Sequence, residues 1–288
     1  MTVRVPVWKY HALGNDYLVV EGPLDAWPAE RVARICDRHR GVGSDGILVH
    51  VPSERADVGV RVVNPDGSRA ETSGNGLRIF ARWAVDVGRV APGAFTIETV
   101  AGVRDAIIDG SAIAEGTKGR VEVSMGPVSF GAVGVPIEAV APPPPDMSAW
   151  PDGWIATEVQ IGNPHLVVVG PEPSEALATR VGHHLETSPR WPHRTNVQIA
   201  TATSSTVVRA VVWERGAGWT LASGSSACAV AAALHALGRT AERVTVEMPG
   251  GVLWVDIDDH GYVSLAGDVT PVLQGAWSDV GDRCESAM

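Results

Sequence analysis

Residues 73–76 read Ser-Gly-Asn-Gly and residues 223–226 read Ser-Gly-Ser-Ser, an offset of 223 − 73 = 150. Each motif precedes an apolar segment with helical periodicity, and glycine ends these segments at Gly88 and Gly238. Serine is a preferred N-cap, and glycine is enriched just past the end of a helix. The sequence therefore predicts two helices of similar length, placed equivalently in two halves of the chain.

Other segments repeat at nearly the same offset. Residues 14–20 (Gly-Asn-Asp-Tyr-Leu-Val-Val) reappear as residues 162–168 (Gly-Asn-Pro-His-Leu-Val-Val), an offset of 162 − 14 = 148. Residues 95–102 reappear as residues 244–251, an offset of 244 − 95 = 149. Several matches in one order at almost one offset indicate an internal duplication.

Short β-branched segments with a period of two, such as residues 58–63 and 207–213, predict strands in both halves. Residues 227–237 are apolar on nearly every side, which predicts a helix buried within its domain. We expect an α+β fold of two pseudo-symmetric domains, each a mixed sheet wrapped around a central helix, with an active-site cleft between them. The expected domains comprise residues 1–120 with 268–288, and residues 121–267.

The chain has 288 residues, 45% of them hydrophobic and 19% charged, which suffices for two domains with buried cores. A net charge of −10 without long runs of like charge disfavours nucleic acid as a partner. The longest apolar stretches, such as residues 166–169 and 227–234, are too short to cross a bilayer. The N-terminus lacks the pattern of a secretory signal, so we expect a cytoplasmic protein without a membrane partner.

The three cysteines, Cys36, Cys228 and Cys284, lie far apart. An odd and sparse count is typical of a reduced protein rather than of a disulfide framework. The nine histidines are scattered, and residues 41–46 lack the context of a phosphate-binding glycine loop. We therefore expect neither a metal nor a bound cofactor.

The two helix starts indicate a possible site, because free N–H groups and the helix dipole attract anions. If both ends face one cleft, a carboxylate fits between them, and Ser73 and Ser223 flank the adjacent carbon from opposite sides. That geometry suits removal of a proton on one face and delivery on the other. The alternative interpretation is that each serine simply caps its helix.

Eight motifs follow one another along the chain, at residues 11–17, 37–46, 64–68, 73–76, 162–165, 194–197, 214–218 and 220–227. In these motifs and their order, from residue 9 to about residue 270, the chain resembles the diaminopimelate epimerase family. The resemblance implies a PLP-independent epimerase of lysine biosynthesis, without cofactor, acting on a small amino acid as a homodimer.

The resemblance also implies the residues of the site. In the family a cysteine on each side of the substrate acts as acid or base, and these positions hold Ser73 and Ser223 here. The family pattern pairs His165 with Ser73 and Glu214 with Ser223. The substrate-binding positions that it implies are Asn15, Asn64, Gly74, Asn75, Asn163, Asn196, Glu214, Arg215, Gly224 and Ser225.

Serine leaves three interpretations open, because its hydroxyl is far less acidic than a thiol and needs an adjacent base. The protein epimerises LL- and meso-diaminopimelate, it isomerises or dehydrates another amino acid, or it binds an amino acid without turnover. Asn64, Asn196 and the pair Glu214 and Arg215 favour the first, since in the family they hold the distal centre of the substrate. Taken singly, these residues also suit turns or a surface ion pair.

Two further residues, Trp219 and Cys228, lie near the second motif. Trp219 stands where the family often has glutamate, and it either narrows the cleft or covers a domain interface. Cys228 lies inside the second helix, where we expect a packed small residue rather than a displaced acid.

Overall fold

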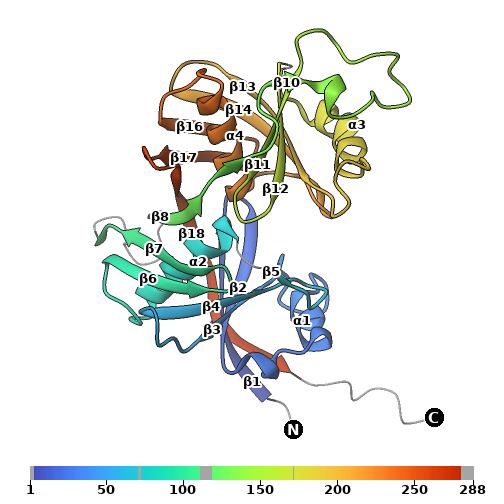
Figure 1. Cartoon of the computed structure of the whole chain (residues 1–288). Helices are drawn as coiled ribbons and strands as arrows, with labels where there is room; N and C mark the ends of the chain where they lie inside the picture. Colours follow the sequence, from blue (N-terminus) through green and yellow to red (C-terminus); the bar gives the residue numbers. More distant parts are fainter. Residues whose placement is uncertain (1–2, 71–72, 111–118, 171, 280–288) are drawn as a thin grey trace, which may run out of the picture. The chain divides into compact units, whose positions relative to one another are not determined.

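The computed structural model describes residues 3–70, 73–110, 119–170 and 172–279. It divides into two compact units, unit 1 (Met1–Val121 with Val269–Met288) and unit 2 (Glu122–Asp268), shown in blue to cyan with red and in green to orange in Figure 1. The chain leaves unit 1 within β8 (Gly119–Pro127) and returns within β18 (Tyr262–Asp279). These divisions lie next to the boundaries 120/121 and 267/268 expected from the sequence.

In its described residues, unit 1 is a mixed sheet with two α-helices. Strand β1 pairs antiparallel with β2, β2 parallel with β3, β3 antiparallel with β4, β4 parallel with β6, and β6 antiparallel with β7. β5 pairs with the end of β4, and residues 270–279 of β18 pair with β1. The elements are β1 (Val3–Ala12), β2 (Asn15–Glu21), η1 (Leu24–Ala26), α1 (Ala29–Cys36), β3 (Ile47–Val51), β4 (Val58–Val63), β5 (Arg69–Ala70), α2 (Gly74–Asp86), β6 (Gly93–Thr99) and β7 (Gly102–Ile108).

Unit 2 repeats this plan strand by strand. β11 pairs antiparallel with β12, β12 parallel with β13, β13 antiparallel with β14, β14 parallel with β16, and β16 antiparallel with β17. β15 pairs with the end of β14, as β5 does with β4. The elements are β9 (Ser129–Phe130), β10 (Val135–Pro136), η3 (Ile137–Ala139), β11 (Ile155–Gln160), β12 (Pro164–Val169), α3 (Glu175–Glu186), β13 (Asn196–Ala202), β14 (Val207–Glu214), β15 (Gly218–Thr220), α4 (Gly224–Ala236), β16 (Arg243–Met248) and β17 (Gly251–Ile257).

The predicted α+β fold with an internal duplication is therefore confirmed. Helices α2 and α4 have 13 residues each and begin at Ser73 and Ser223 as N-caps. Gly88 and Gly238 follow them with φ of 71° and 65°, a left-handed conformation that glycine adopts without steric cost. The predicted strand at residues 58–63 is β4, and that at residues 207–213 lies within β14.

Successive side chains along the strands point to opposite faces of each sheet, and both faces are covered. In unit 1, Leu18 of β2 and Ile47 of β3 pack with Ile35 of α1. Leu48, the residue after Ile47, points the other way, and its side chain lies beside Gly76 of α2. Because both faces are covered, residues 17–20 of β2 and all residues of β3 except His50 are apolar, rather than alternating with polar residues.

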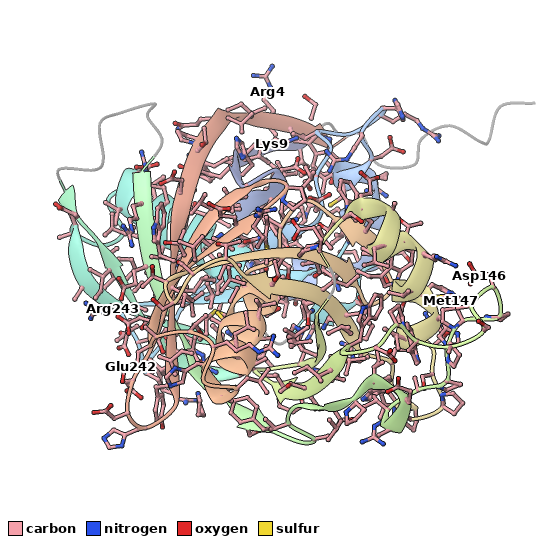
Figure 2. The ribbon with its side chains drawn as sticks, turned by 90° about the horizontal axis from the view of Figure 1, so that it is seen from above. Arg4, Lys9, Asp146, Met147, Glu242 and Arg243 are labelled. Carbon is pink, nitrogen blue, oxygen red and sulfur yellow. The ribbon has the colours of Figure 1, made fainter. Side chains whose placement is uncertain are left out.

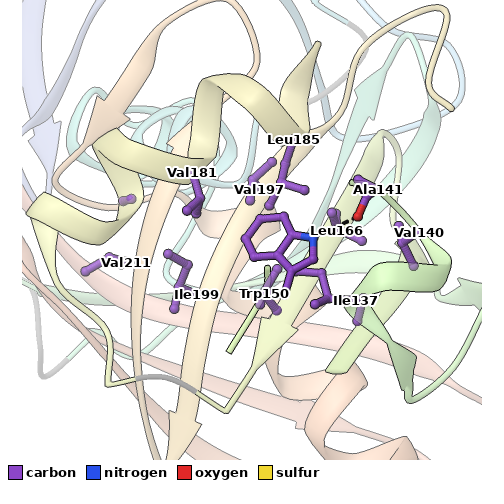
Figure 3. Close-up of a cluster of buried hydrophobic side chains, with 13 residues drawn as sticks. Ile137, Val140, Ala141, Trp150, Leu166, Val181, Leu185, Val197, Ile199 and Val211 are labelled. Carbon is purple, nitrogen blue, oxygen red and sulfur yellow. Dashed lines mark hydrogen bonds between the residues drawn. The ribbon is translucent and has the colours of Figure 1, made fainter. Parts of the chain in front are cut away.

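Unit 2 shows the same two-faced arrangement, with α3 on one side of the sheet. Figure 3 shows the cluster under α3, in which Val181 and Leu185 contact strand residues such as Ile199. Trp150 closes the cluster, and its indole Nε1 donates a hydrogen bond of 2.8 Å to the carbonyl of Ala141, so its polar atom is satisfied inside the core.

The central helices differ in how they meet their sheets. Helix α4 contacts β11, β12, β13, β14, β16 and β17, which its alanine-rich surface allows because small side chains let strands approach closely. Helix α2 instead buries two arginines, Arg78 and Arg82. Arg82 Nε donates to Asp86 at 2.8 Å, and the hydroxyl of Tyr10 donates to the same carboxylate at 3.0 Å. Burial, together with the charge of Asp86, raises the pKa of Tyr10.

Charged residues on the surface form ion pairs of a different kind. Arg4, Asp146 and Arg243 are exposed, and their side chains project from the ribbon in Figure 2. Asp146 pairs with Arg180 at 2.8 Å. Exposed pairs of this kind contribute about 0–1 kcal/mol, so the fold depends on the buried clusters instead.

Candidate functional site

The first candidate residue in unit 1, Ser73, caps helix α2. Its Oγ accepts a hydrogen bond of 3.0 Å from the backbone N–H of Gly76, and its backbone is extended with φ −143°. A Cβ placed on Gly76 would lie 3.1 Å from the Cβ of Ser73 and 3.1 Å from Leu48 Cδ2. Glycine at this position therefore lets the serine side chain fold over the helix end. Gly74, the first residue of the helix, is buried.

Two asparagines predicted to bind substrate meet beside this helix end. Asn75 Nδ2 donates to Asn15 Oδ1 at 3.1 Å, and Asn15 Nδ2 donates to Asp45 Oδ2 at 2.7 Å. The buried guanidinium of Arg78 donates to Asn75 Oδ1 at 2.6 Å. The structure thus brings Asn15 and Asn75 together at the start of α2 and fixes the orientation of both amides.

A buried carboxylate anchors the segment that carries Asp45. Asp16 accepts from Lys9 at 2.8 Å and from Arg38 at 2.7 Å, and Arg38 also contacts Asp45 at 2.6 Å. Burial alone would raise the pKa of Asp16, but the hydrogen bonds and charges of Arg38 and Lys9 outweigh it and hold that pKa below its usual value. This network ties the loop before β3 to the start of β2.

Asn64 lies in the turn between β4 and β5. Its Nδ2 donates to Ser68 Oγ at 2.9 Å, and its backbone N–H donates to the carbonyl of Ser68 at 2.8 Å. Among the described residues, no hydrogen bond joins Asn64 to Asn15 or Asn75. Asn64 therefore acts as a turn former in this structure, and its contact with a substrate stays a prediction.

In unit 2, Ser223 occupies the N-cap of α4 but does not use its side chain as a cap. It is 6% exposed with φ −140°, and within the described part of the chain its hydroxyl has no hydrogen-bond partner. Ser226 stands where unit 1 has Gly76, and its Oγ accepts from Gln198 Nε2 at 3.0 Å. The predicted binding residues Gly224 and Ser225 are the first two residues of α4.

His165 is buried at the start of β12, with hydrogen bonds at both ring nitrogens. Gln198 Nε2 lies 3.0 Å from Nδ1, and Asn163 Oδ1 lies 2.6 Å from Nε2. Burial lowers the pKa of His165, the hydrogen bond from Gln198 opposes this and the charge of Arg215 adds to it, so that the pKa is about 3. The imidazole is therefore neutral at pH 7 and a weak base.

Asn196 connects this cluster to the Glu214–Arg215 turn. Its Nδ2 donates to the carbonyl of Pro164 at 2.9 Å, and its Oδ1 accepts from the backbone N–H of Arg215 at 3.0 Å. Glu214 is half-buried at the end of β14 and pairs with Gly218 of β15. The structure thus gathers the predicted residues Asn163, His165, Asn196, Glu214 and Arg215 within unit 2.

Glu186, a residue without a sequence motif, supports the same turn. It is 2% exposed and accepts from the backbone N–H of Gly216 at 2.9 Å and from Trp213 Nε1 at 2.8 Å. Burial would raise its pKa, but these hydrogen bonds and Arg194 hold it below its usual value. Gln198 was also missed, although its place two residues after Asn196 in a strand puts it on the same face.

Cys228 and Trp219, the two further residues near the second motif, are packed inside unit 2. Cys228 is fully buried within α4, as expected for a packed small residue. Trp219 is half-buried and packs against the cluster under α3. Cys36 and Cys228 are not in a disulfide, and Cys284 lies outside the described residues.

The described residues contain no cluster of three or more His, Cys, Asp or Glu side chains suited to a metal ion. None of the helices described is both long enough and apolar enough to cross a membrane.

Solved structures place this fold among known ones. A hydroxyproline epimerase from Agrobacterium vitis aligns with a TM-score of 0.72 at 15% identity, covering 97% of this chain and 94% of that one. A phenazine biosynthesis protein of the PhzF family from Bacillus anthracis aligns with a TM-score of 0.67 at 16% identity, covering 95% and 99%. The chain therefore has the duplicated fold that these epimerase and PhzF structures share.

Sequence comparison gives the family. The model for diaminopimelate epimerase matches residues 7–131 and 157–272. Diaminopimelate epimerase 2 of Nostoc sp. is 41% identical, covering 94% of this chain and 95% of that protein, and the diaminopimelate epimerase of Desulforudis audaxviator is 40% identical, covering 93% and 98%. The chain belongs to the diaminopimelate epimerase family, a family of isomerases.

Proposed function

We propose that the protein interconverts LL- and meso-diaminopimelate by proton transfer at the α-carbon, without a cofactor. The observation that carries this proposal is that this chain has, at the family's substrate-binding positions in both repeats, the polar residues that the family uses there. The chain keeps Asn64, Asn196, Glu214 and Arg215, which a substrate without a second amino-acid centre would not need. Identity of 41% over nearly the whole chain supports the same substrate.

In the proposed reaction, the N–H groups at the starts of α2 and α4 bind the carboxylate at the reacting centre. One serine oxygen, of Ser73 or Ser223, takes the α-proton, and the electron pair of the C–H bond moves toward the carboxylate. The other serine then delivers its proton to the opposite face of the same carbon. Asn15, Asn75 and Asn163 donate to the substrate around this centre.

Each serine needs help, because a hydroxyl keeps its proton at neutral pH unless a base takes it. We propose Glu214 as the partner of Ser223 and His165 as the partner of Ser73. The neutral imidazole of His165 is a weak acceptor, because its pKa is about 3 and both ring nitrogens already have hydrogen-bond partners. It can take the proton of Ser73 only at Nδ1, and only when the hydrogen bond from Gln198 is broken. We therefore expect turnover to be slow compared with a site that has two thiols.

A second candidate is an amino-acid binder without turnover, and a specific observation favours it. The hydroxyl of Ser73 is committed to the helix cap, and His165 is a weak base. Isomerisation or dehydration of another amino acid uses the same carboxylate site and is a third possibility. From the family we also propose a cytoplasmic homodimer, which light scattering of the purified protein tests.

Proton NMR in deuterium oxide separates these candidates. LL- and meso-diaminopimelate are incubated with the wild type, with the double variant Ser73→Ala/Ser223→Ala, and with Ser148→Ala, an exposed serine, as the control. Loss of the α-proton signal with the wild type and Ser148→Ala alone supports the epimerase. Line broadening of the ligand without exchange would show a binder, and absence of both would contradict the proposed substrate.

A further inference from the structure

Four polar side chains of unit 2 form one hydrogen-bonded row between α4, β13 and β12. The row runs from Ser226 through Gln198 and His165 to Asn163, with separations of 3.0, 3.0 and 2.6 Å. Ser226 and Gln198 are fully buried, and His165 is 2% exposed. Buried polar side chains in a strand are costly unless satisfied, so this row requires an explanation beyond packing.

The hydrogen bonds of this row have one of two polarities. In the first, Gln198 Nε2 donates to both Ser226 Oγ and His165 Nδ1, and the proton on Nε2 of His165 donates to Asn163 Oδ1. In the second, both amides are reversed, so that Gln198 Oε1 accepts and Asn163 Nδ2 donates to Nε2. The orientation of a side-chain amide is assigned from its hydrogen-bond network. The two polarities are therefore compared by the hydrogen bonds that each leaves unmade.

Counting unsatisfied atoms favours the first polarity. It leaves one buried acceptor, Gln198 Oε1, without a hydrogen-bond partner. The second would leave both N–H groups of the same buried amide without an acceptor. Orphaned N–H donors are rarer in proteins than under-used carbonyl oxygens.

We propose that Gln198 is a positioning residue that holds His165 as the tautomer with its proton on Nε2 and, through it, sets the amide of Asn163 as a donor. With Oδ1 engaged by the imidazole, Asn163 has only its Nδ2 hydrogens to offer. It therefore selects a carboxylate oxygen rather than an ammonium group at its subsite. This inference rests on the proposed function only for the identity of the ligand.

The structure also explains why Gln198, and not a neighbour, has this role. Gln198 is paired in register with Val167 across the parallel strands β12 and β13, and His165 is paired with Asn196. Residues 196 and 198 therefore share one face with residues 165 and 167. That face meets α4, where Ser226 fixes the far end of the Gln198 amide.

Long-range proton–nitrogen NMR of protein labelled with ¹⁵N-histidine tests the tautomer without substrate. The resonances of His165 are assigned by their loss in His165→Gln. The wild type at pH 7 is expected to show a protonated Nε2 and an unprotonated Nδ1. In Gln198→Leu this preference should be averaged between the two nitrogens, while Gln160→Leu, an exposed glutamine at the end of β11, should match the wild type. A protonated Nδ1 in the wild type, or an unchanged tautomer in Gln198→Leu, would overturn the proposal.

Calorimetric titration with meso-diaminopimelate tests the consequence for Asn163. Gln198→Leu should weaken binding about tenfold, the size expected when a hydrogen bond to a charged group is lost. Asn163→Asp places a carboxylate where a donor is required and should weaken binding at least as much. Equal affinity of Gln198→Leu and Gln160→Leu would contradict the positioning role. Failure of the wild type to bind would instead count against the proposed function, since the tautomer is measured separately.

Discussion

The starts of α2 and α4 have the same backbone but use their serines differently. Ser73 caps α2 through the N–H of Gly76, whereas the hydroxyl of Ser223 makes no cap on α4. The difference follows from one side chain, because a Cβ at Gly76 would lie 3.2 Å from Ser73 Oγ, and unit 2 carries Ser226 there. Duplication has thus preserved the helix end, while the hydroxyl of Ser73 accepts a hydrogen bond from its helix and that of Ser223 has no partner among the described residues.

The largest effect is expected from replacing both serines. In Ser73→Cys/Ser223→Cys, thiols at two helix N-termini are more acidic than hydroxyls, so α-proton exchange should rise roughly hundredfold. Proton NMR in deuterium oxide measures the rate. The double variant should also lose activity on mild peroxide and recover it with dithiothreitol, whereas the wild type should be indifferent to both. A rate no higher than that of the wild type would refute the role of these positions.

Unit 1 has no histidine at the position that His165 occupies in unit 2. Because His165 is buried in its neutral form, the free energy of unfolding should depend on pH. The unfolded chain protonates this histidine at a pKa near 6.5, but the folded protein does so only at about 3. The unfolded state thus binds more protons between these values, and the free energy of unfolding should fall as pH drops below 6.5, by at most about 1.4 kcal/mol per pH unit.

Urea unfolding at pH 7 and pH 5 measures this dependence. His165→Gln should show a smaller loss between the two pH values than the wild type, while His39→Gln, an exposed control, should behave like the wild type. Equal pH slopes for His165→Gln and the wild type would mean that His165 is not buried in its neutral form.

Adding a methyl group at Gly76 should make the start of α2 resemble that of α4. The new Cβ would lie 3.1 Å from both Leu48 Cδ2 and Ser73 Cβ, so Gly76→Ala should displace the serine cap and cost about 2 kcal/mol. The control is Gly275→Ala, where the nearest atom would lie 3.9 Å away. Urea unfolding that shows no difference between the two variants would contradict the packing explanation.

The smallest expected effect is a difference in the free energy of unfolding between the alanine variants of the two serines. Ser73→Ala removes a cap and should lower the free energy of unfolding by about 1 kcal/mol. Ser223→Ala removes a hydroxyl without a partner among the described residues and should change stability by less than about 0.5 kcal/mol. Thermal and urea unfolding compare them, and equal losses would remove the distinction between the two helix ends.

The sequence predicted the elements that depend on local pattern. Helix starts at Ser73 and Ser223 and the glycine stops follow from capping and left-handed φ, and the repeat offsets gave the duplication. The N-cap preference of serine alone does not identify which helix start uses its serine as a cap. That difference follows from Gly76 in unit 1 and Ser226 in unit 2, and Leu48 of β3 further limits the space around Gly76 from another strand.

The polar networks were less accessible to sequence reasoning. The Asn15–Asn75 hydrogen bond joins residues 60 apart, and that of Gln198 with His165 joins residues 33 apart. Both depend on strand pairing and register, which no short motif encodes. Glu186 could not be predicted for a different reason: a glutamate at the end of an amphipathic helix is usually solvated.

The position of deuterium during turnover tests the two-base epimerase most directly. LL-diaminopimelate is converted in deuterium oxide, and substrate and product are separated at low conversion and analysed by mass spectrometry. The two-base mechanism predicts one deuterium in the meso product and almost none in the recovered LL substrate, because the serine on the opposite face delivers a solvent-derived proton. Deuterium in the recovered substrate before product appears would show a single base, and its absence from both would contradict turnover on this substrate.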